Sequence, residues 1–182
     1  MTGLHTANRL AGYGLAVGLP PGWEGRIYRR AASTPAAPAA GTALAADPAG
    51  QSAAESIVRW HDERTHPVLH LANFALPAGR GDFGTGAVER MSADHVFIAL
   101  LQFGPDCLGT ALYAPQGFPR LAARDFNPNG LQRKVAGQAG FQHFFTAAGR
   151  PLCLYVVLGA HRRAGALCPR INEVLGRIEV SP

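Results

Sequence analysis

Two histidines are the first residues whose types and spacing suggest chemistry. His66 and His70 lie four residues apart, so on an extended strand they share one face. His61 and Asp62 lie just upstream, which makes a metal site conceivable. At ~3.3 Å per residue, however, the two Cα atoms are about 13 Å apart, too far for one zinc ion unless the chain bends. We therefore expect two ordinary strand histidines, with no metal ion and no cofactor.

A glycine-rich stretch at residues 82–86 reads Asp-Phe-Gly-Thr-Gly. Backbone amides in such a loop can cradle an anion, as they do in phosphate-binding loops. The stretch lacks the Gly-x-Gly-x-x-Gly and Walker patterns. A tight connection between two elements explains the glycines at least as well, and anion binding remains the alternative.

The three cysteines do not form a recognisable catalytic or metal-binding set. Cys153 lies in an apolar run and Cys168 on an apolar helical stripe, so both are expected in the core. Cys107 follows Asp106, whose carboxylate raises a thiol pKa rather than lowering it. The number and spacing of the cysteines argue against a disulfide framework and a zinc ribbon, and free thiols suit the cytoplasm.

No motif typical of a hydrolase appears. The sequence has no Gly-x-Ser-x-Gly elbow, no His-Glu-x-x-His helix and no spaced carboxylate pair. We predict no catalytic residues and do not expect an enzyme. The alternative is a hydrolase or transferase that uses Cys107 or the histidines of residues 61–70.

Aromatic residues near expected loops are candidates for a contact surface with a partner. Large aromatic side chains often anchor protein interfaces. The simpler interpretation places most of them in the core or at its rim. The candidate interface residues are Trp23, Tyr28, Trp60 and Phe118.

Composition excludes several classes of protein. The chain has 182 residues, of which 47% are hydrophobic and 16% charged, and no apolar run approaches the ~20 residues of a membrane span. Its net charge is +5, but the densest basic groups are Arg29-Arg30 and residues 161–163, so nucleic-acid binding is not expected. The N-terminus lacks the pattern of a signal peptide, which also favours a cytoplasmic protein.

The order of apolar patterns predicts a mixed α and β domain. Alternation favours a hairpin of strands 15–19 and 24–30, and a second hairpin of strands 141–146 and 152–158. Residues 67–76 and 96–103 are apolar on both sides, as central strands are. A final helix carries a stripe at offsets of three and four. Because of Pro169, the helix is expected either to begin near Ala166 or to kink at the proline, with the proline side chain on the solvent face. The stripe consists of Ala164, Leu167, Cys168, Ile171, Val174 and Leu175.

Residues 1–182 are expected to form one domain with an inserted low-complexity segment at 31–54. Residues 31–50 alone hold ten alanines and three prolines without either helical or strand periodicity. About thirty residues precede the segment, too few to bury a core of their own, so a two-domain arrangement is not expected.

One motif resembles a known fold family. Residues 13–23 read Tyr-Gly-Leu-Ala-Val-Gly-Leu-Pro-Pro-Gly-Trp, a strand followed by Pro-x-Gly-Trp, and the chain closes with a hairpin and an amphipathic helix. This order resembles the PsbP-like fold superfamily. The resemblance implies an α+β fold in which helices pack on an antiparallel sheet, an α/β sandwich. Residues 66–176 also resemble a set of uncharacterised bacterial proteins.

The resemblance also implies a function. Members of the superfamily include the extrinsic PsbP subunit of photosystem II, a Ran-binding nuclear import factor and bacterial chaperones of secreted effectors, most of which bind proteins rather than catalyse. We therefore expect a non-enzymatic, protein-binding module of the chaperone or adaptor kind. A protein that binds a small apolar ligand between sheet and helix is the second alternative, beside the enzyme.

Overall fold

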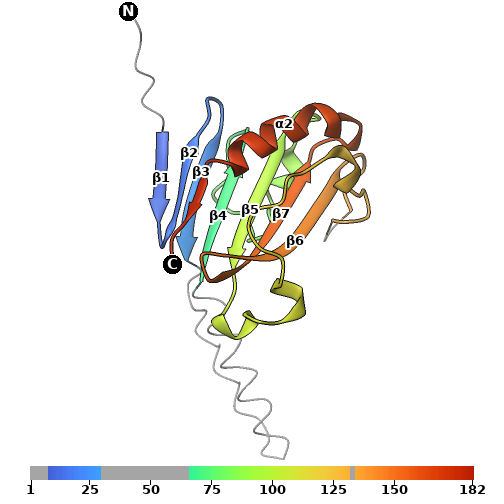
Figure 1. The fold of residues 1–182 in the computed structure, drawn as a ribbon. Coiled ribbons are helices and arrows are strands. Elements are labelled where there is room, and N and C mark those ends of the chain that lie inside the picture. The colour runs from blue at the N-terminus through green and yellow to red at the C-terminus, as the bar shows by residue number, and fades with distance from the viewer. Residues whose placement is uncertain (1–7, 30–65, 132–133) are drawn as a thin grey trace, which may run out of the picture.

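The computed structural model describes residues 8–29, 66–131 and 134–182. The inserted segment at 31–54 and Trp60 lie outside these residues. The described part is a mixed α and β fold, mostly sheet, with two antiparallel sheets and the helix α2, Ala164–Leu175 (Figure 1). Short 3-10 helices occupy Val88–Arg90 (η1), Pro105–Cys107 (η2), Ala111–Tyr113 (η3), Ala123–Asp125 (η4) and His161–Arg163 (η5).

A five-stranded sheet forms the centre of the molecule, in the order β3-β4-β5-β7-β6. Every neighbouring pair is antiparallel, which confirms the predicted sheet type. All of β4 and all of β5 except its last residue are buried, as predicted for central strands. The predicted late hairpin is confirmed with longer strands. The bounds are Glu24–Arg29 (β3), Pro67–Ala72 (β4), Val96–Gln102 (β5), Ala139–Ala147 (β6) and Arg150–Leu158 (β7).

The predicted first hairpin is wrong. Strand β2, Leu15–Leu19, pairs with β1, Asn8–Gly12, and with β8, Ile178–Val180, in a separate three-stranded sheet. Strand β3 pairs instead with β4. β2 and β3 still follow each other in the chain, but the turn between them carries the chain from one sheet to the other.

The turn between β2 and β3 is tight, and the hairpin of this region lies earlier in the chain. The Trp23 amide donates to the Pro20 carbonyl at 3.1 Å, and Gly22 has a φ of +76°, so residues 20–23 form a tight corner. The hairpin turn lies earlier, at Tyr13 and Gly14, whose φ angles are +53° and +75°. Strand β1 escaped prediction because Leu10 is its single large apolar side chain.

Helix α2 confirms the predicted stripe, since all six stripe residues are buried. The helix begins at Ala164 and not near Ala166, and Pro169 lies inside it with its side chain exposed, as expected for the second alternative. Gly176 occupies the C-cap with a right-handed φ of −66°.

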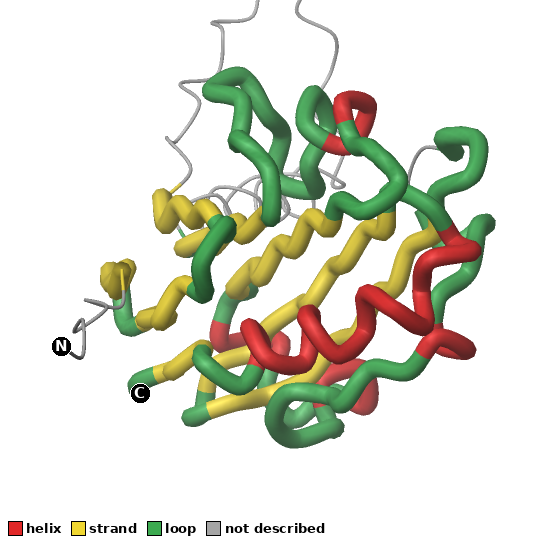
Figure 2. The backbone as a smooth tube through the Cα atoms, turned by 90° about the horizontal axis from the view of Figure 1, so that it is seen from above, coloured by secondary structure: helices red, strands yellow, loops and turns green. Residues whose placement is uncertain are grey.

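The two sides of the five-stranded sheet are covered differently (Figure 2). On one side, the helix face, α2 and β2 pack against the sheet and share an apolar cluster with it. On the other side, the loop face, the cover consists of chain outside the sheets, including residues 74–91. Strand residues alternate between the faces, as in β5, where Ile98 points to the helix face and Phe97 to the loop face.

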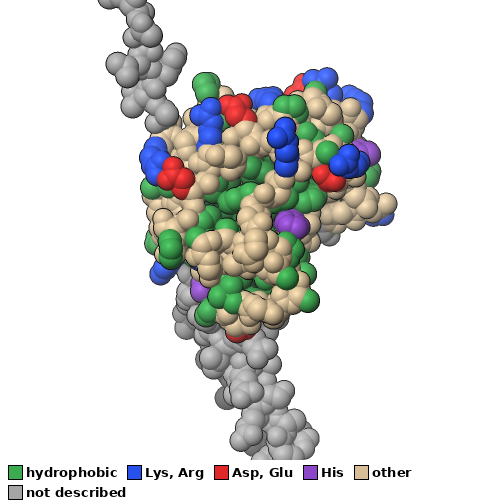
Figure 3. Space-filling view, viewed as in Figure 1, with side chains coloured by type: hydrophobic (Ala, Val, Ile, Leu, Met, Phe, Trp, Pro, Cys, Tyr) green, Lys and Arg blue, Asp and Glu red, His purple; other side chains and the backbone are tan. Residues whose placement is uncertain are grey.

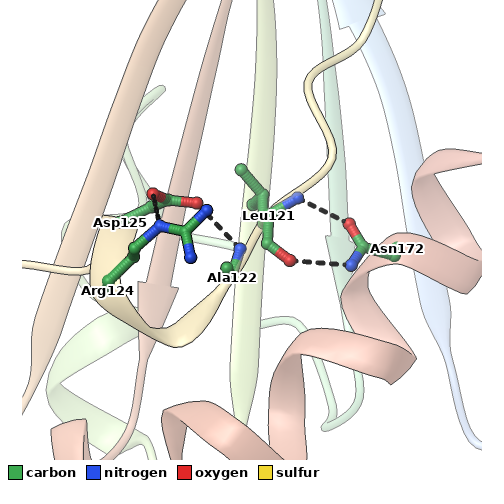
Figure 4. Close-up of polar contacts among 5 residues, drawn as sticks. All are labelled: Leu121, Ala122, Arg124, Asp125 and Asn172. Carbon is green, nitrogen blue, oxygen red and sulfur yellow. Dashed lines mark hydrogen bonds and ion pairs between the residues drawn. The ribbon is translucent and has the colours of Figure 1, made fainter.

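The connection between β5 and β6 is tied to α2 by one side chain (Figure 4). Asn172 accepts from the Leu121 amide at 2.8 Å and donates to the Leu121 carbonyl at 2.9 Å. The Asp125 carboxylate accepts from the Ala122 amide at 2.8 Å and closes the next turn. The irregular connection between β5 and β6 is thereby held against helix α2.

Candidate functional site

The structure does not gather the predicted interface residues into one surface. Trp23 is 8% exposed and belongs to the helix-face cluster. Phe118 is half-buried against Phe145, with ring centroids 5.0 Å apart. Tyr28 is half-buried on the loop face, and Trp60 lies outside the described residues. Each described member of the set has packing partners of its own.

Sequence reasoning missed the most exposed apolar surface of the described residues. Residues 104–115, here called the lobe, project beyond the end of the sheet and show hydrophobic side chains at its lower edge (Figures 1 and 3). Leu108 is 38% exposed and Leu112 is 56% exposed. Asp106 is the single charged residue in the lobe. Low charge in a Pro- and Gly-containing stretch was the available signal, but it does not indicate which leucines point outward.

The lobe is anchored from inside. Its Tyr113 is 5% exposed and contacts Phe144 edge-on, with ring centroids 5.5 Å apart. Thr146 of β6 donates its hydroxyl to the Tyr113 carbonyl and its amide to the Pro115 carbonyl, both at 2.8 Å. Because Tyr113 points inward, its neighbour Leu112 is presented to solvent by a fixed backbone.

A third exposed apolar residue belongs to the same end of the molecule. Tyr13 is 50% exposed, and the guanidinium of Arg29 lies 4.8 Å from the centre of its ring. Arg150 donates to the Tyr13 carbonyl at 2.9 Å and, through Nε, to the Gln102 side chain at 2.9 Å. Gln102 is two residues before the lobe, so Arg150 joins the β1–β2 turn to the base of the lobe.

The electrostatics at this end are basic. Burial lowers the pKa of Arg150, and the positive charge of Arg29 lowers it further. Arg150 still carries its positive charge near neutral pH, because a guanidinium group loses its proton only far above that range. We call this set of residues the apolar end: Tyr13, Leu108, Leu112 and Arg29. Tyrosine and arginine are enriched at interface hot spots, and the two leucines add exposed apolar surface.

The predicted strand histidines have different surroundings. His66 is half-buried just before β4, whereas His70 on β4 is 0% exposed on the loop face. His70 accepts at Nδ1 from Arg80 Nε at 2.8 Å. Its Nε2 lies 2.7 Å from the Asp82 carbonyl and 3.4 Å from the Tyr28 hydroxyl. We call Tyr28, His70, Arg80 and Asp82 the histidine cluster.

The histidine cluster holds a loop and is not arranged as a general base. An arginine N–H can only donate, so Nδ1 carries a lone pair and the proton resides on Nε2, which donates to the Asp82 carbonyl. The Tyr28 hydroxyl donates to the Asp82 carboxylate at 2.9 Å. With Nδ1 held by Arg80 and the ring buried, the geometry offers a substrate proton no direct path to this imidazole.

The alternative of anion binding by the glycine-rich stretch does not fit the observed hydrogen bonds. The Gly81 amide donates to Thr85 at 2.9 Å and the Gly84 amide to Gly81 at 2.8 Å. The Gly86 amide donates to the Glu89 carboxylate at 2.7 Å. These amides face protein oxygens and form no cradle, so the glycines serve the tight connection.

The cysteines do not gather into a nucleophilic site. Burial raises the pKa of Cys153 to about 11, so its thiol stays protonated at neutral pH. Burial, followed by the charge of Asp125, also raises the pKa of Cys168. Both are buried, as predicted, and Cys107 is half-buried in the lobe.

The described residues contain neither a cluster of metal-ligating side chains nor a helix that could span a membrane. Within residues 8–29, 66–131 and 134–182, no three side chains of His, Cys, Asp or Glu lie close enough together to hold a metal ion. In the same ranges, no helix has the length and apolar content to cross a membrane.

Comparison with known proteins gives no relative from which a role could be transferred: no family model, curated protein or solved structure matches the chain.

Proposed function

We propose that the chain is a non-enzymatic, protein-binding module of the chaperone or adaptor kind, and that the apolar end is its contact surface. The observation that carries the proposal is the concentration of exposed large apolar side chains there. In the part of the chain that the structure describes, the large hydrophobic residues classed as exposed are Tyr13, Leu108 and Leu112, and all three belong to this end.

The anchoring of the lobe supports binding rather than chance exposure. Tyr113 and Thr146 fix the backbone that presents Leu112, so little conformational entropy is lost when a partner covers it. Arg29 adds a cation beside the ring of Tyr13, which favours a partner with an apolar centre and acidic groups near it.

The fold family and the cellular compartment are two further parts of the proposal. An antiparallel sheet covered on one face by a C-terminal helix supports a PsbP-like sandwich, the fold that the Pro-x-Gly-Trp motif suggested. Free Cys107, Cys153 and Cys168 support a cytoplasmic setting.

The test is affinity capture from the native host with the tagged full chain. The test variant combines Leu108→Ser and Leu112→Ser, and its matched control combines Ala123→Ser and Ala166→Ser, two exposed positions outside the apolar end. We expect a specific protein to be captured by the wild type and by the control. Its yield should fall at least about tenfold with the test variant, because burying one leucine contributes about 1.5–3 kcal/mol and about 1.4 kcal/mol corresponds to a tenfold change in affinity.

Two results would overturn the proposal. Equal capture by the test variant, with unchanged thermal unfolding, would remove the apolar end from the interface. Repeated capture of no specific protein, together with a co-purified small molecule in mass spectrometry, would favour ligand binding instead.

A further inference from the structure

Two hairpin turns of the structure have the same backbone geometry. The β1–β2 hairpin turns at Tyr13 and Gly14, and the β6–β7 hairpin turns at Ala148 and Gly149. The φ angles are +53° and +75° in the first turn and +49° and +72° in the second. Two-residue turns with positive φ at both positions favour Asn-Gly. Of the described residues other than glycine, Tyr13 and Ala148 are the ones with a positive φ.

Tyrosine is an unfavourable residue for the first position of such a turn. A positive φ brings the Cβ of any residue except glycine close to a backbone oxygen, and a bulky residue is rare in this conformation. Tyr13 does not recover the cost by burial, since it is 50% exposed. Residues held in strained conformations cluster at functional sites, and an exposed ring is suited to binding.

The backbone of this turn is held from the side of the domain. Arg150 donates to the Tyr13 carbonyl at 2.9 Å. The Ser181 amide donates to the Gly14 carbonyl, also at 2.9 Å. Gly14 packs so closely that an added Cβ would clash with the Arg150 guanidinium. A fixed backbone therefore presents the Tyr13 ring, and a partner that covers the ring restricts little motion.

The charge beside the ring indicates the chemistry of the partner. Arg29 is exposed and lies over the Tyr13 ring, with its guanidinium carbon 4.8 Å from the ring centre. The ion pairs within the described residues include neither Arg29 nor Arg150. A partner carboxylate can pair with the Arg29 guanidinium while an apolar side chain covers the exposed half of the ring.

We propose that Tyr13 is a preformed anchor for an acidic linear segment of the partner, in which an apolar side chain covers the Tyr13 ring and a neighbouring carboxylate pairs with Arg29. The anchor rests on the proposed function, to which it adds the chemistry of the partner and the residue that recognises it. Charge favours such a segment over a second copy of this chain, because two copies with a net charge of +5 each repel each other.

Selection from a phage-displayed library of random linear peptides, with the tagged full chain as target, tests this chemistry. We expect enriched peptides that carry Asp or Glu beside a large apolar residue, and the affinity of the synthetic peptides should fall with added salt. Tyr13→Asn should weaken their binding at least about 30-fold, which corresponds to the roughly 2 kcal/mol of a hot-spot residue. Arg29→Gln should weaken it by about fivefold and remove most of the salt dependence.

Ala148→Asn is the matched control, because it places the same residue at the same position of the other turn. This variant should bind the peptides as the wild type does. Asparagine suits both turns, so Tyr13→Asn should unfold at no lower temperature than the wild type, and its loss of binding is then not a loss of folding. A strongly lowered unfolding temperature would show that the Tyr13 side chain is structural and would overturn the proposal.

The anchor role is also overturned if no peptides or peptides without acidic residues are enriched, or if Tyr13→Asn binds them as tightly as the wild type. In the last case, the variant that combines Leu108→Ser and Leu112→Ser separates two outcomes. Peptides lost on that variant leave the apolar end as the contact surface, so the proposed function stands without the anchor. Peptides that bind both variants as tightly as the wild type remove the apolar end as well.

Discussion

The helix face of the central sheet is covered mainly by the regular elements α2 and β2, with Leu121 and Phe126 of the β5–β6 connection beside them. The loop face is covered by residues 74–91, whose regular structure is the short η1. On the helix face, the buried residues of α2 and β2 are apolar and repeat with the periods of a helix and a strand. On the loop face, His70 is buried and hydrogen-bonded, and Gly84 meets Phe97 at close range.

The difference separates two ways of covering a sheet. Apolar burial is non-directional, so the helix face is stabilised by many interchangeable contacts. The loop face has an apolar cluster of its own, but its cover also depends on individual contacts, a glycine at positive φ and a polar cluster around a neutral imidazole. The helix face should therefore govern global stability, and the loop face should open locally.

Truncating the centre of α2 should have the largest effect. Leu167 is 1% exposed against the sheet, and Leu167→Ala should lower the free energy of unfolding by about 2–5 kcal/mol through lost burial and the cavity left behind. Denaturant unfolding measures the loss. Arg170→Ala, exposed on the same helix, is the control and should change stability by at most about 0.5 kcal/mol. Equal losses would show that α2 is not packed as described.

A glycine substitution on the loop face should have a smaller effect. Gly84 has a φ of +88° and no room for a Cβ beside Phe97, so Gly84→Ala should cost about 1–3 kcal/mol. Gly79→Ala is the matched control, since no atom lies within 4 Å of its added Cβ and its φ is not positive. Hydrogen exchange should show the loss first in residues 77–88. A global loss as large as that of Leu167→Ala would erase the distinction between the two faces.

The same distinction explains how much could be predicted from the sequence. Periodicity alone placed β4, β5, the late hairpin and the buried stripe of α2, because apolar burial leaves its period in the chain. The pairing of β2 with β8 was missed, since it joins residues that are distant in sequence.

The candidate sites were harder to predict than the fold. Arg80 and Asp82 meet His70 only after the loop folds back ten to twelve residues, and no spacing rule describes that return. Leu112 and Tyr113 are adjacent in an aperiodic stretch, yet one is exposed and the other buried. Such directions are set by tertiary contacts, here those of Thr146 and Phe144, and not by local pattern.

The smallest effect should come from the polar tie on the helix face. Asn172 makes two neutral hydrogen bonds to the Leu121 backbone, so Asn172→Ala should cost about 1–2 kcal/mol, less than the loss of one buried leucine on the same helix. Glu173→Ala, at the next and exposed position, is the control. Denaturant unfolding should show the small loss, and exchange of the Leu121 amide should accelerate because its acceptor is gone. If Asn172→Ala instead matched Leu167→Ala, directional contacts would govern the helix face as well, and the contrast between the two faces would fail.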